Sequence, residues 1–491
     1  MTRPRTVRAL ALVIAFSLAA PSSRASQSRR DGYDYYGATR ALVRRGTQAL
    51  ILCNGLFVSE RSLDEVYAQE LTFGGIPLLH PRDGGVTIDR ERRTVLVGGG
   101  GNDPIPAMRA VYRQGLGAVI LSPRQTFADI EALPELTLPP LAGNPDTIPW
   151  PDGDLLSDAP LPADIDLDAL AAASNWAFDP EAQPQPARTT ISVLVVYGGR
   201  IVHERYAPGF DRTTRTRIYS VSKSIGVTLI GMLVERGELS LDGPLGLEWL
   251  PRGRDADTDP RQAITLEDLL HMSSGLESVD NAGNADVTGS GLSYWGGASS
   301  VAAALSRGLV REPGTHWDYE NYDTLLAVHA MKRALGGGQA YLEFPRRALF
   351  DKLGMRSTIV GTDRMGDFML SSQIYTNARD LARFGLLYLR GGEWNGEQLI
   401  SREWIDFVRT PAPSTAATGR FYGGQWWLSR EGEAGAIPDA FSARGNRGNY
   451  ITIVPSLELV VVRRGLDRSA AGDRGFDMTE FVRRVAKAFG A

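Results

Sequence analysis

The sequence contains very little cysteine and very little lysine. Its 491 residues include one cysteine, Cys53, so the chain by itself cannot form an internal disulfide and must be stabilised by packing. Cys53 ends the apolar run 49–53, which indicates a buried structural thiol rather than a nucleophile. Nearly all of the 53 basic residues are arginine, because lysine occurs only at Lys223, Lys332, Lys352 and Lys487.

The chain also lacks a strong net charge, a long apolar run in its main body and a metal-binding pattern. A net charge of −4 and a pI near 5.9 give no electrostatic basis for binding nucleic acid or an anionic membrane. Beyond residue 28, no apolar run is long enough to predict a membrane span in the mature chain. The five histidines are scattered and no His/Cys/Asp cluster has metal-ligand spacing, so we expect neither a metal nor an organic cofactor.

The first 28 residues are typical of a secretory signal peptide. A basic start is followed by the 12-residue apolar stretch Ala9–Ala20, which is too short to span a bilayer. Ser23-Arg24-Ala25 then places small residues at the −3 and −1 positions of a cleavage site. We therefore expect cleavage after Ala25 and a periplasmic or secreted protein. An uncleaved N-terminal anchor is the alternative.

Composition divides the remainder into three parts. Residues 26–146 form an N-terminal region of unknown role, residues 147–190 a linker with a leading helix, and residues 191–491 the main domain. In the N-terminal region we expect helices at 38–58 and 62–71 and strands at 86–89, 94–97 and 117–121. The main domain has strand signals at both ends, at 191–197, 201–206, 450–454 and 459–463, around a mostly helical middle. This order predicts an α+β fold: an antiparallel sheet flanked by helices, with a large helical insertion and an N-terminal α+β extension.

The most informative stretch is Ser220-Val221-Ser222-Lys223, which opens the apolar run 224–234. The run predicts a buried helix, on which Ser220 and Lys223 share a face. Arginine cannot lose its proton in a protein, whereas a buried lysine can, so a lysine beside a serine in this chain indicates amine chemistry. Only about one ordinary lysine in 2,500 is neutral at pH 7, but burial lowers the lysine pKa by up to roughly 3–5 units. A neutral Lys223 would activate Ser220 as a nucleophile. The alternative is a serine N-cap beside a solvated lysine.

Further stretches follow this motif in a fixed order. They are 265–276, 313–321, 353–355, 378–385 and 448–450. With them, the chain from Ile191 to its end resembles the serine β-lactamase and penicillin-recognising hydrolase superfamily. It is most similar to the class C-type branch, which includes esterases, D-aminopeptidases and 6-aminohexanoate-dimer hydrolases.

The resemblance implies a serine hydrolase that forms an acyl-enzyme with a small-molecule amide or ester. Ser220 would be the nucleophile, and Lys223 and Tyr319 would move protons, with the choice of base between them left open. The backbone N–H groups of Ser220 and Asn446 would form the oxyanion hole. The expected substrate-binding residues are Asn321, Gly445, Trp317 and Tyr450.

Tyr-x-Asn occurs twice, at Tyr319–Asn321 and at Tyr375–Asn377. The Pro-Gly-Thr-x-Trp lead-in selects the first copy, as it does in the family, whereas the second leads into a predicted helix capped by Thr376 or Asn377.

The sequence departs from the β-lactamases around the expected cleft. Ala443 replaces their polar residue near the substrate carboxylate, and Glu320 adds a negative charge close to the nucleophile. Arg444 or Arg447 could substitute for the missing polar group, although strand alternation predicts that Arg444 points away from the face of Ala443.

We therefore expect amide or ester hydrolysis. The alternatives are a β-lactamase or D,D-peptidase, and a non-catalytic cell-wall-binding or scaffold protein. The oligomeric state is not predicted.

Overall fold

The computed structural model describes residues 35–72, 76–100, 103–182, 188–253, 258–280, 285–429, 435–468 and 475–490. Residues Tyr36–Ala491 belong to one compact unit. The expected signal peptide, residues 1–25, lies outside the described residues. No helix in the described ranges is long and apolar enough to cross a membrane.

The main sheet is six-stranded and antiparallel, in the order β12-β13-β14-β15-β5-β6. Its strands are β5 (Thr190–Tyr197), β6 (Arg200–Tyr206), β12 (Trp427–Leu428), β13 (Phe441–Gly445), β14 (Asn449–Val454) and β15 (Leu459–Gly465). The first and last parts of the main domain thus meet where β15 pairs with β5. The four predicted strands of the main domain are confirmed as β5, β6, β14 and β15.

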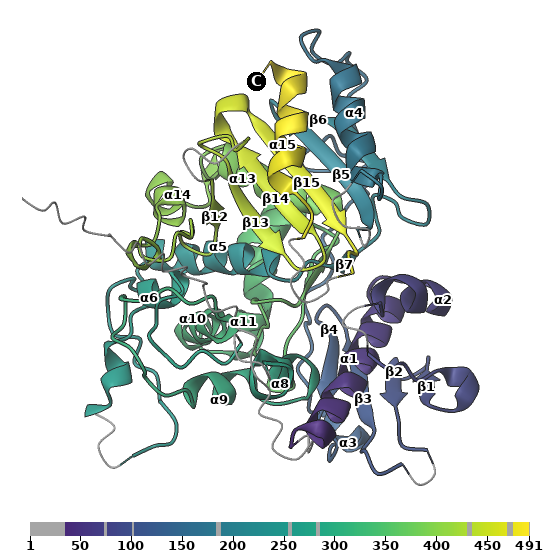
Figure 1. Cartoon of the computed structure of the whole chain (residues 1–491), viewed down its shortest axis with the longest axis vertical. Helices are drawn as coiled ribbons and strands as arrows, with labels where there is room; N and C mark the ends of the chain where they lie inside the picture. Colours follow the sequence, from purple (N-terminus) through teal and green to yellow (C-terminus); the bar gives the residue numbers. More distant parts are fainter. Residues whose placement is uncertain are drawn as a thin grey trace, which may run out of the picture. The chain divides into compact units, whose positions relative to one another are not determined.

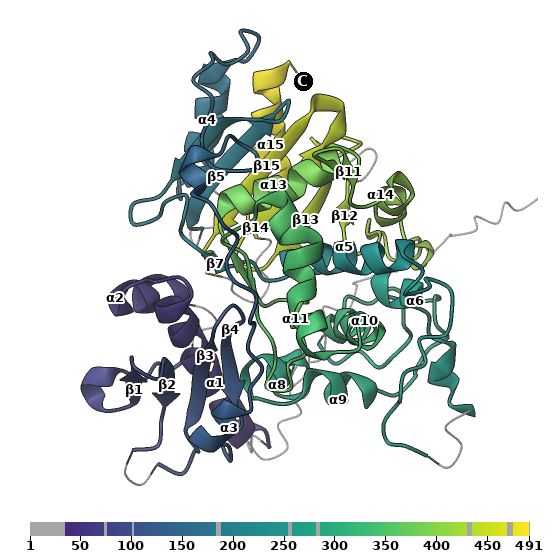
Figure 2. The same ribbon diagram turned by 180° about the vertical axis from the view of Figure 1, so that it is seen from behind.

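Helices cover both faces of this sheet (Figures 1 and 2). Helices α5 (Val221–Glu235) and α13 (Ala378–Leu389) pack in the larger core with Ile451 and Ile453. Helices α4 (Leu167–Phe178) and α15 (Met478–Ala486) pack in a second core with Val195 and Val461. Alternate residues of the central strands therefore enter different cores, as the pleat requires.

The chain between β6 and β12 is mainly helical and supplies the predicted insertion. Its further helices are α6 (Leu266–Leu270), α7 (Ala285–Thr288), α8 (Ser290–Trp295), α9 (Ser300–Leu305), α10 (Asn321–Ala334), α11 (Gly338–Pro345), α12 (Asp351–Leu353) and α14 (Arg402–Arg409). The short strands are β7 (Thr216–Arg217), β8 (Ile359–Val360), β9 (Ile374–Thr376), β10 (Glu393–Trp394) and β11 (Glu397–Gln398). The predicted α+β fold class is confirmed.

In the N-terminal region, helix α1 (Gly37–Phe57) packs on a four-stranded antiparallel sheet. The strands are β1 (Val86–Asp89), β2 (Thr94–Val97), β3 (Met108–Arg113) and β4 (Gly117–Leu121), and the short helix α3 (Phe127–Glu131) follows. Strand β3 was not predicted. The predicted helix at 62–71 is confirmed as α2 (Leu63–Glu65) continued by the π-helical turn η1 (Val66–Glu70).

Cys53 on α1 is fully buried and its thiol donates to Arg93 O over 3.7 Å. Burial raises the pKa of this thiol, as expected of a structural cysteine.

Candidate active site

Ser220 lies at the N-terminal end of α5, with its hydroxyl free of a capping role. It occupies the N-cap position but makes no side-chain cap hydrogen bond. The preceding residue, Tyr219, has a φ of 52°, a left-handed conformation that a non-glycine residue adopts only under strain. Lys223, one turn into the helix, is 1% exposed. The alternative of a capping serine beside a solvated lysine is therefore wrong.

The amine of Lys223 has three oxygen partners at hydrogen-bond distance. Nζ lies 3.2 Å from Ser220 Oγ, 2.6 Å from Asn321 Oδ1 and 2.9 Å from the carbonyl oxygen of Ser371. Burial lowers the pKa of Lys223 to about 7, and Arg217 adds to this effect, whereas Asp280 and Glu320 oppose it. The lysine can therefore be neutral near pH 7.

The Tyr319 hydroxyl hydrogen-bonds to the hydroxyl of Ser220. Burial raises the pKa of Tyr319 to about 12. Lys223 Nζ lies over the face of the tyrosine ring, 4.9 Å from its centroid. The structure thus brings together Ser220, Lys223, Tyr319 and Asn321. Tyr375, from the second Tyr-x-Asn copy, lies instead in β9, where it pairs with Arg217 of β7.

Asp280 completes this network and was missed by the sequence analysis. Its Oδ2 accepts from the backbone N–H of Asn321 over 3.0 Å and from the Asn321 Nδ2 over 2.7 Å. Its Oδ1 accepts from the N–H and the hydroxyl of Ser290, each over 2.8 Å. Asp280 lies in a loop 41 residues before Asn321, and no local pattern in the sequence marks it.

Glu320 forms a buried carboxyl pair with Asp280. Glu320 is 1% exposed, and its Oε2 accepts from the N–H groups of Val279, over 2.9 Å, and Asp280, over 3.1 Å. Burial and the neighbouring Asp280 raise the pKa of Glu320 to about 8. Burial alone would raise the pKa of Asp280 too, but its hydrogen bonds with Glu320, Ser290 and Asn321 lower it. Near neutral pH the pair therefore holds one proton, on Glu320. The expectation of a separate negative charge on Glu320 is corrected accordingly.

Strand β13 passes close to the start of α5. A Cβ added at Gly445 would lie 2.2 Å from the carbonyl oxygen of Ile218 and 3.2 Å from the nitrogen of Val221, so only glycine permits this approach. Asn446 follows at the exposed start of the β13–β14 turn. The residues on either side of Ser220 therefore border the strand end that leads into Asn446.

The remaining predicted residues lie farther from the nucleophile. Trp317 is buried in an aromatic cluster with Met272 and Tyr422, where it packs behind Tyr319 with ring centroids 6.3 Å apart. Half-buried Trp427 stacks on Tyr319 at 5.6 Å. Trp427 and Tyr319 are therefore the aromatic surfaces closest to solvent in this cluster.

Tyr450 does not join the site. It belongs to the second core, where its ring lies 6.3 Å from Phe476. Its partner across the strands is Arg444, so both side chains face away from buried Ala443, as alternation predicts for Arg444.

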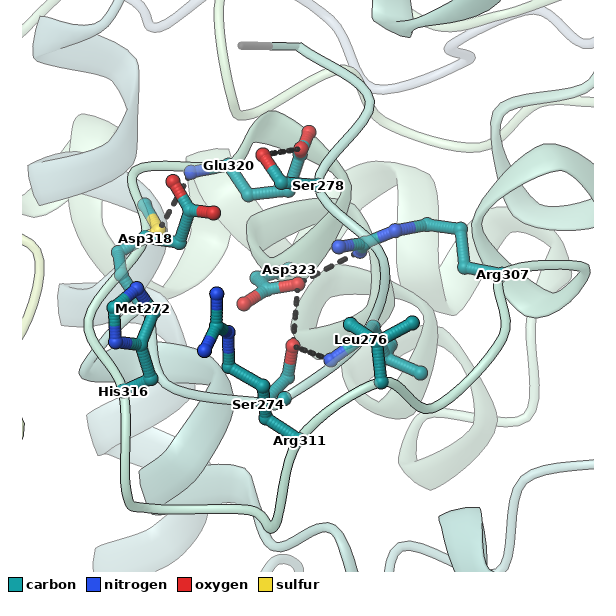
Figure 3. A pocket seen from close by; sticks show the side chains of 12 residues that line it. Met272, Ser274, Leu276, Ser278, Arg307, Arg311, His316, Asp318, Glu320 and Asp323 are labelled. Atoms are coloured by element: carbon teal, nitrogen blue, oxygen red, sulfur yellow. Dashed lines mark hydrogen bonds and ion pairs between the residues drawn. The ribbon is translucent and has the colours of Figure 1, made fainter. Parts of the chain in front are cut away.

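Glu320 also lines a small pocket (Figure 3). Its volume is about 90 Å³, and Ser274, Arg307, Arg311, His316, Asp318 and Asp323 are among its lining residues. Ser220 is not part of the lining. The pocket has room for a few water molecules, and it is separate from the nucleophile. Among the described residues, no three His, Cys, Asp or Glu side chains are grouped to hold a metal ion.

The chain belongs to the beta-lactamase family, whose model, described as Beta-lactamase, matches residues 178–463. Its fold is that of the beta-lactamase-type hydrolases, as the sequence resemblance predicted. The chain is 25% identical over 324 residues to a 6-aminohexanoate-dimer hydrolase from Paenarthrobacter ureafaciens, covering 62% of this chain and 79% of that protein. It is 29% identical over 196 residues to esterase EstB from Burkholderia gladioli, and this match covers 36% of this chain and 48% of the esterase.

The structure of a 6-aminohexanoate-dimer hydrolase homologue from Bacillus anthracis has a similar fold. It superposes with a TM-score of 0.54 at 19% identity and covers 72% of this chain and 91% of that one. At this identity the likeness concerns the fold.

Proposed function

We propose that the protein is an exported serine hydrolase that cleaves an amide or ester bond through an acyl-enzyme on Ser220. Export rests on the signal peptide expected at residues 1–25. The catalytic part rests on the buried Lys223 amine and its three partners. The names of two relatives, a 6-aminohexanoate-dimer hydrolase and an esterase, support a hydrolytic reaction.

The hydrogen bonds of the Lys223 amine are the observation that supports the proposed acyl-enzyme reaction most directly. A neutral amine has two N–H donors and one lone pair. Asn321 Oδ1 and the Ser371 carbonyl can only accept, so they take the two N–H groups. The lone pair is then left for the Ser220 hydroxyl, which can donate its proton. This arrangement makes Lys223 the base, since a Tyr319 with a pKa near 12 keeps its proton at neutral pH.

The steps then follow from these positions. Ser220 Oγ attacks the carbonyl carbon while its proton passes to Lys223 Nζ. The negative charge that develops on the carbonyl oxygen is held by the N–H groups of Ser220 and Asn446. Tyr319 donates its proton to the leaving nitrogen or oxygen as the bond breaks, and the Lys223 ammonium then gives a proton back to the Tyr319 phenolate, which restores the neutral amine. Water then attacks the acyl-enzyme by the reverse sequence, which releases the acid and restores Ser220.

Reaction with a fluorophosphonate probe tests the proposal. The probe should label the wild-type protein at Ser220, as located by peptide mass spectrometry, and Ser220→Ala should abolish both labelling and hydrolysis of p-nitrophenyl butyrate. Labelling that persists in Ser220→Ala, or that maps to Ser222, contradicts the assignment. A wild-type protein that neither reacts nor hydrolyses any amide, ester or β-lactam would favour the non-catalytic scaffold.

A further inference from the structure

The turn that contains Asn446 is tied to the N-terminal region through one arginine. Arg447, the next residue, is 3% exposed and has a φ of 59°, in the left-handed region. Its guanidinium donates to five oxygen atoms. They are the carbonyls of Gln69, Glu70 and Leu466, each at 2.8 Å, the Thr72 hydroxyl at 2.9 Å and the carbonyl of Asp467 at 3.0 Å. Three of these five acceptors belong to residues 69–72.

The acceptor segment is itself fixed to the hydrolase part of the chain. Arg61 and Glu70 form a buried ion pair at 3.2 Å, and the Arg61 guanidinium lies 4.4 Å from the ring centroid of Phe210, in the loop before β7. Strand β7 leads within three residues to Ser220. The segment Arg61–Thr72 therefore connects the approach to the nucleophile with the β13–β14 turn.

The turn is ordered further by its own side chains. The Arg447 N–H donates to Asn446 Oδ1 over 2.7 Å, and Asn449 Nδ2 donates to the carbonyl oxygen of Asn446 over 2.9 Å. These bonds set the peptide planes around Asn446, but they lie within the turn and can move with it. The guanidinium of Arg447 is the group that ties the turn to residues 69–72.

We propose that segment Arg61–Thr72 of the N-terminal region contributes to hydrolysis by anchoring Arg447, and that Arg447 is the positioning residue for the Asn446 N–H. The inference rests on the proposed function, in which the Asn446 N–H stabilises the oxyanion. Arg447 does not touch the substrate. It holds a strained turn conformation that aims this N–H, and it can do so because residues 69–72 supply the acceptors. The N-terminal region is thereby required for the rate of hydrolysis.

A matched pair of arginine variants tests this proposal. Arg447→Met removes the donors, and Arg356→Met is the control, because Arg356 also donates from the hydrolase part to backbone carbonyls, those of residues 141–143, away from the turn. We expect Arg447→Met to lower kcat for p-nitrophenyl butyrate by about 10²-fold, the usual loss for one oxyanion donor, with KM changed by less than about threefold. Arg356→Met should retain the wild-type kcat, and Arg447→Lys should restore part of the loss.

The carbonyl stretch of the acyl-enzyme isolates the oxyanion contact. In the wild-type acyl-enzyme this infrared band should lie at lower frequency than in the free ester, and Arg447→Met should shift it back toward the free value. The inference is overturned if the band of the Arg447→Met acyl-enzyme stays at the wild-type frequency, or if kcat of Arg447→Met lies within about threefold of wild type. It is also overturned if Arg447→Met and Arg356→Met lose kcat equally. If Arg447→Met does not fold, Arg447→Lys decides by the same two measurements. A wild-type protein that forms no acyl-enzyme at Ser220 refutes the proposed function instead.

Discussion

Asp280 fixes the side-chain orientation of Asn321. An ionised carboxylate can only accept hydrogen bonds, so the Nδ2 of Asn321, 2.7 Å away, must face Asp280. The amide oxygen of Asn321 is thereby turned toward Lys223 Nζ, 2.6 Å away. The buried negative charge of Asp280 thus both orients a lysine partner and raises the lysine pKa against the effect of burial.

The first prediction concerns this charge. Activity requires neutral Lys223, so kcat/KM should fall as the pH drops through its pKa of about 7. Removing a nearby negative charge lowers a lysine pKa, so the double variant Asp280→Asn/Glu320→Gln should move this acidic limb to lower pH. Each single variant should move it less, because the remaining carboxyl can still ionise. The measurement is the pH profile of kcat/KM, with Asp286→Asn, a change in helix α7, as a control. An acidic limb that stays in place or moves upward contradicts the interpretation.

The second prediction separates charge from titration at Lys223. Lys223→Arg keeps a cation but supplies no lone pair, so it should be nearly as damaging as Lys223→Ala. We expect both variants to lose roughly 10²–10⁴-fold in kcat, the usual contribution of a general base. A Lys223→Arg enzyme within about tenfold of wild type would show that the site needs a positive charge instead.

The third prediction compares the two Tyr-x-Asn tyrosines. Tyr319→Phe deletes the hydroxyl that contacts Ser220 and should lower kcat strongly at unchanged thermal stability. Tyr375→Phe alters a buried residue of β9 that is not part of the proposed relay, and it should leave kcat near wild type. Steady-state kinetics on both variants make the comparison. Equal losses would mean that the Pro-Gly-Thr-x-Trp lead-in does not distinguish the copies.

The fourth prediction concerns substrate preference. Ala443 is fully buried, and Arg447 donates to five protein oxygens. Arg444 lies on the other face of β13, with its guanidinium 5.6 Å from the ring centroid of Trp427, so neither arginine takes the place of the polar side chain that Ala443 replaces. A charge-assisted hydrogen bond contributes roughly 1.5–3 kcal/mol, or about one to two powers of ten in affinity. We therefore expect kcat/KM for p-nitrophenyl butyrate to exceed that for nitrocefin on the same preparation. An equal or higher value for nitrocefin would favour the β-lactamase alternative.

Local patterns were sufficient for much of the fold. The apolar run after Lys223 predicted a buried helix and α5 is one, and Asn377 caps α13 as one of the two predicted caps. Strand β3 was missed, although its neighbours were predicted. Its residues carry three charges or hydroxyls in six positions, and only pairing with β2 and β4 makes it a strand.

The site was predictable where residues are close in sequence or share a motif, and less so elsewhere. Ser220 and Lys223 lie one turn apart, so helix geometry alone brings them together. The folding of the helical insertion brings the Ser371 carbonyl to Lys223 and Asp280 to Asn321, the other partner of the lysine. Tyr450 was misplaced because its pairing with Arg444, which fixes its face of the sheet, is a property of register and not of either strand alone.

The burial of Cys53 has a practical consequence. It is the only thiol in the sequence, it is fully enclosed between α1 and its sheet, and it is poorly ionised. A thiol-reactive dye can therefore modify the protein only in those molecules where α1 has opened. The rate of modification therefore measures how often α1 opens, and each protein molecule can take up one dye molecule. Timed beside the loss of ester hydrolysis during thermal unfolding, it reports whether the N-terminal region separates before, or together with, the loss of the hydrolytic centre.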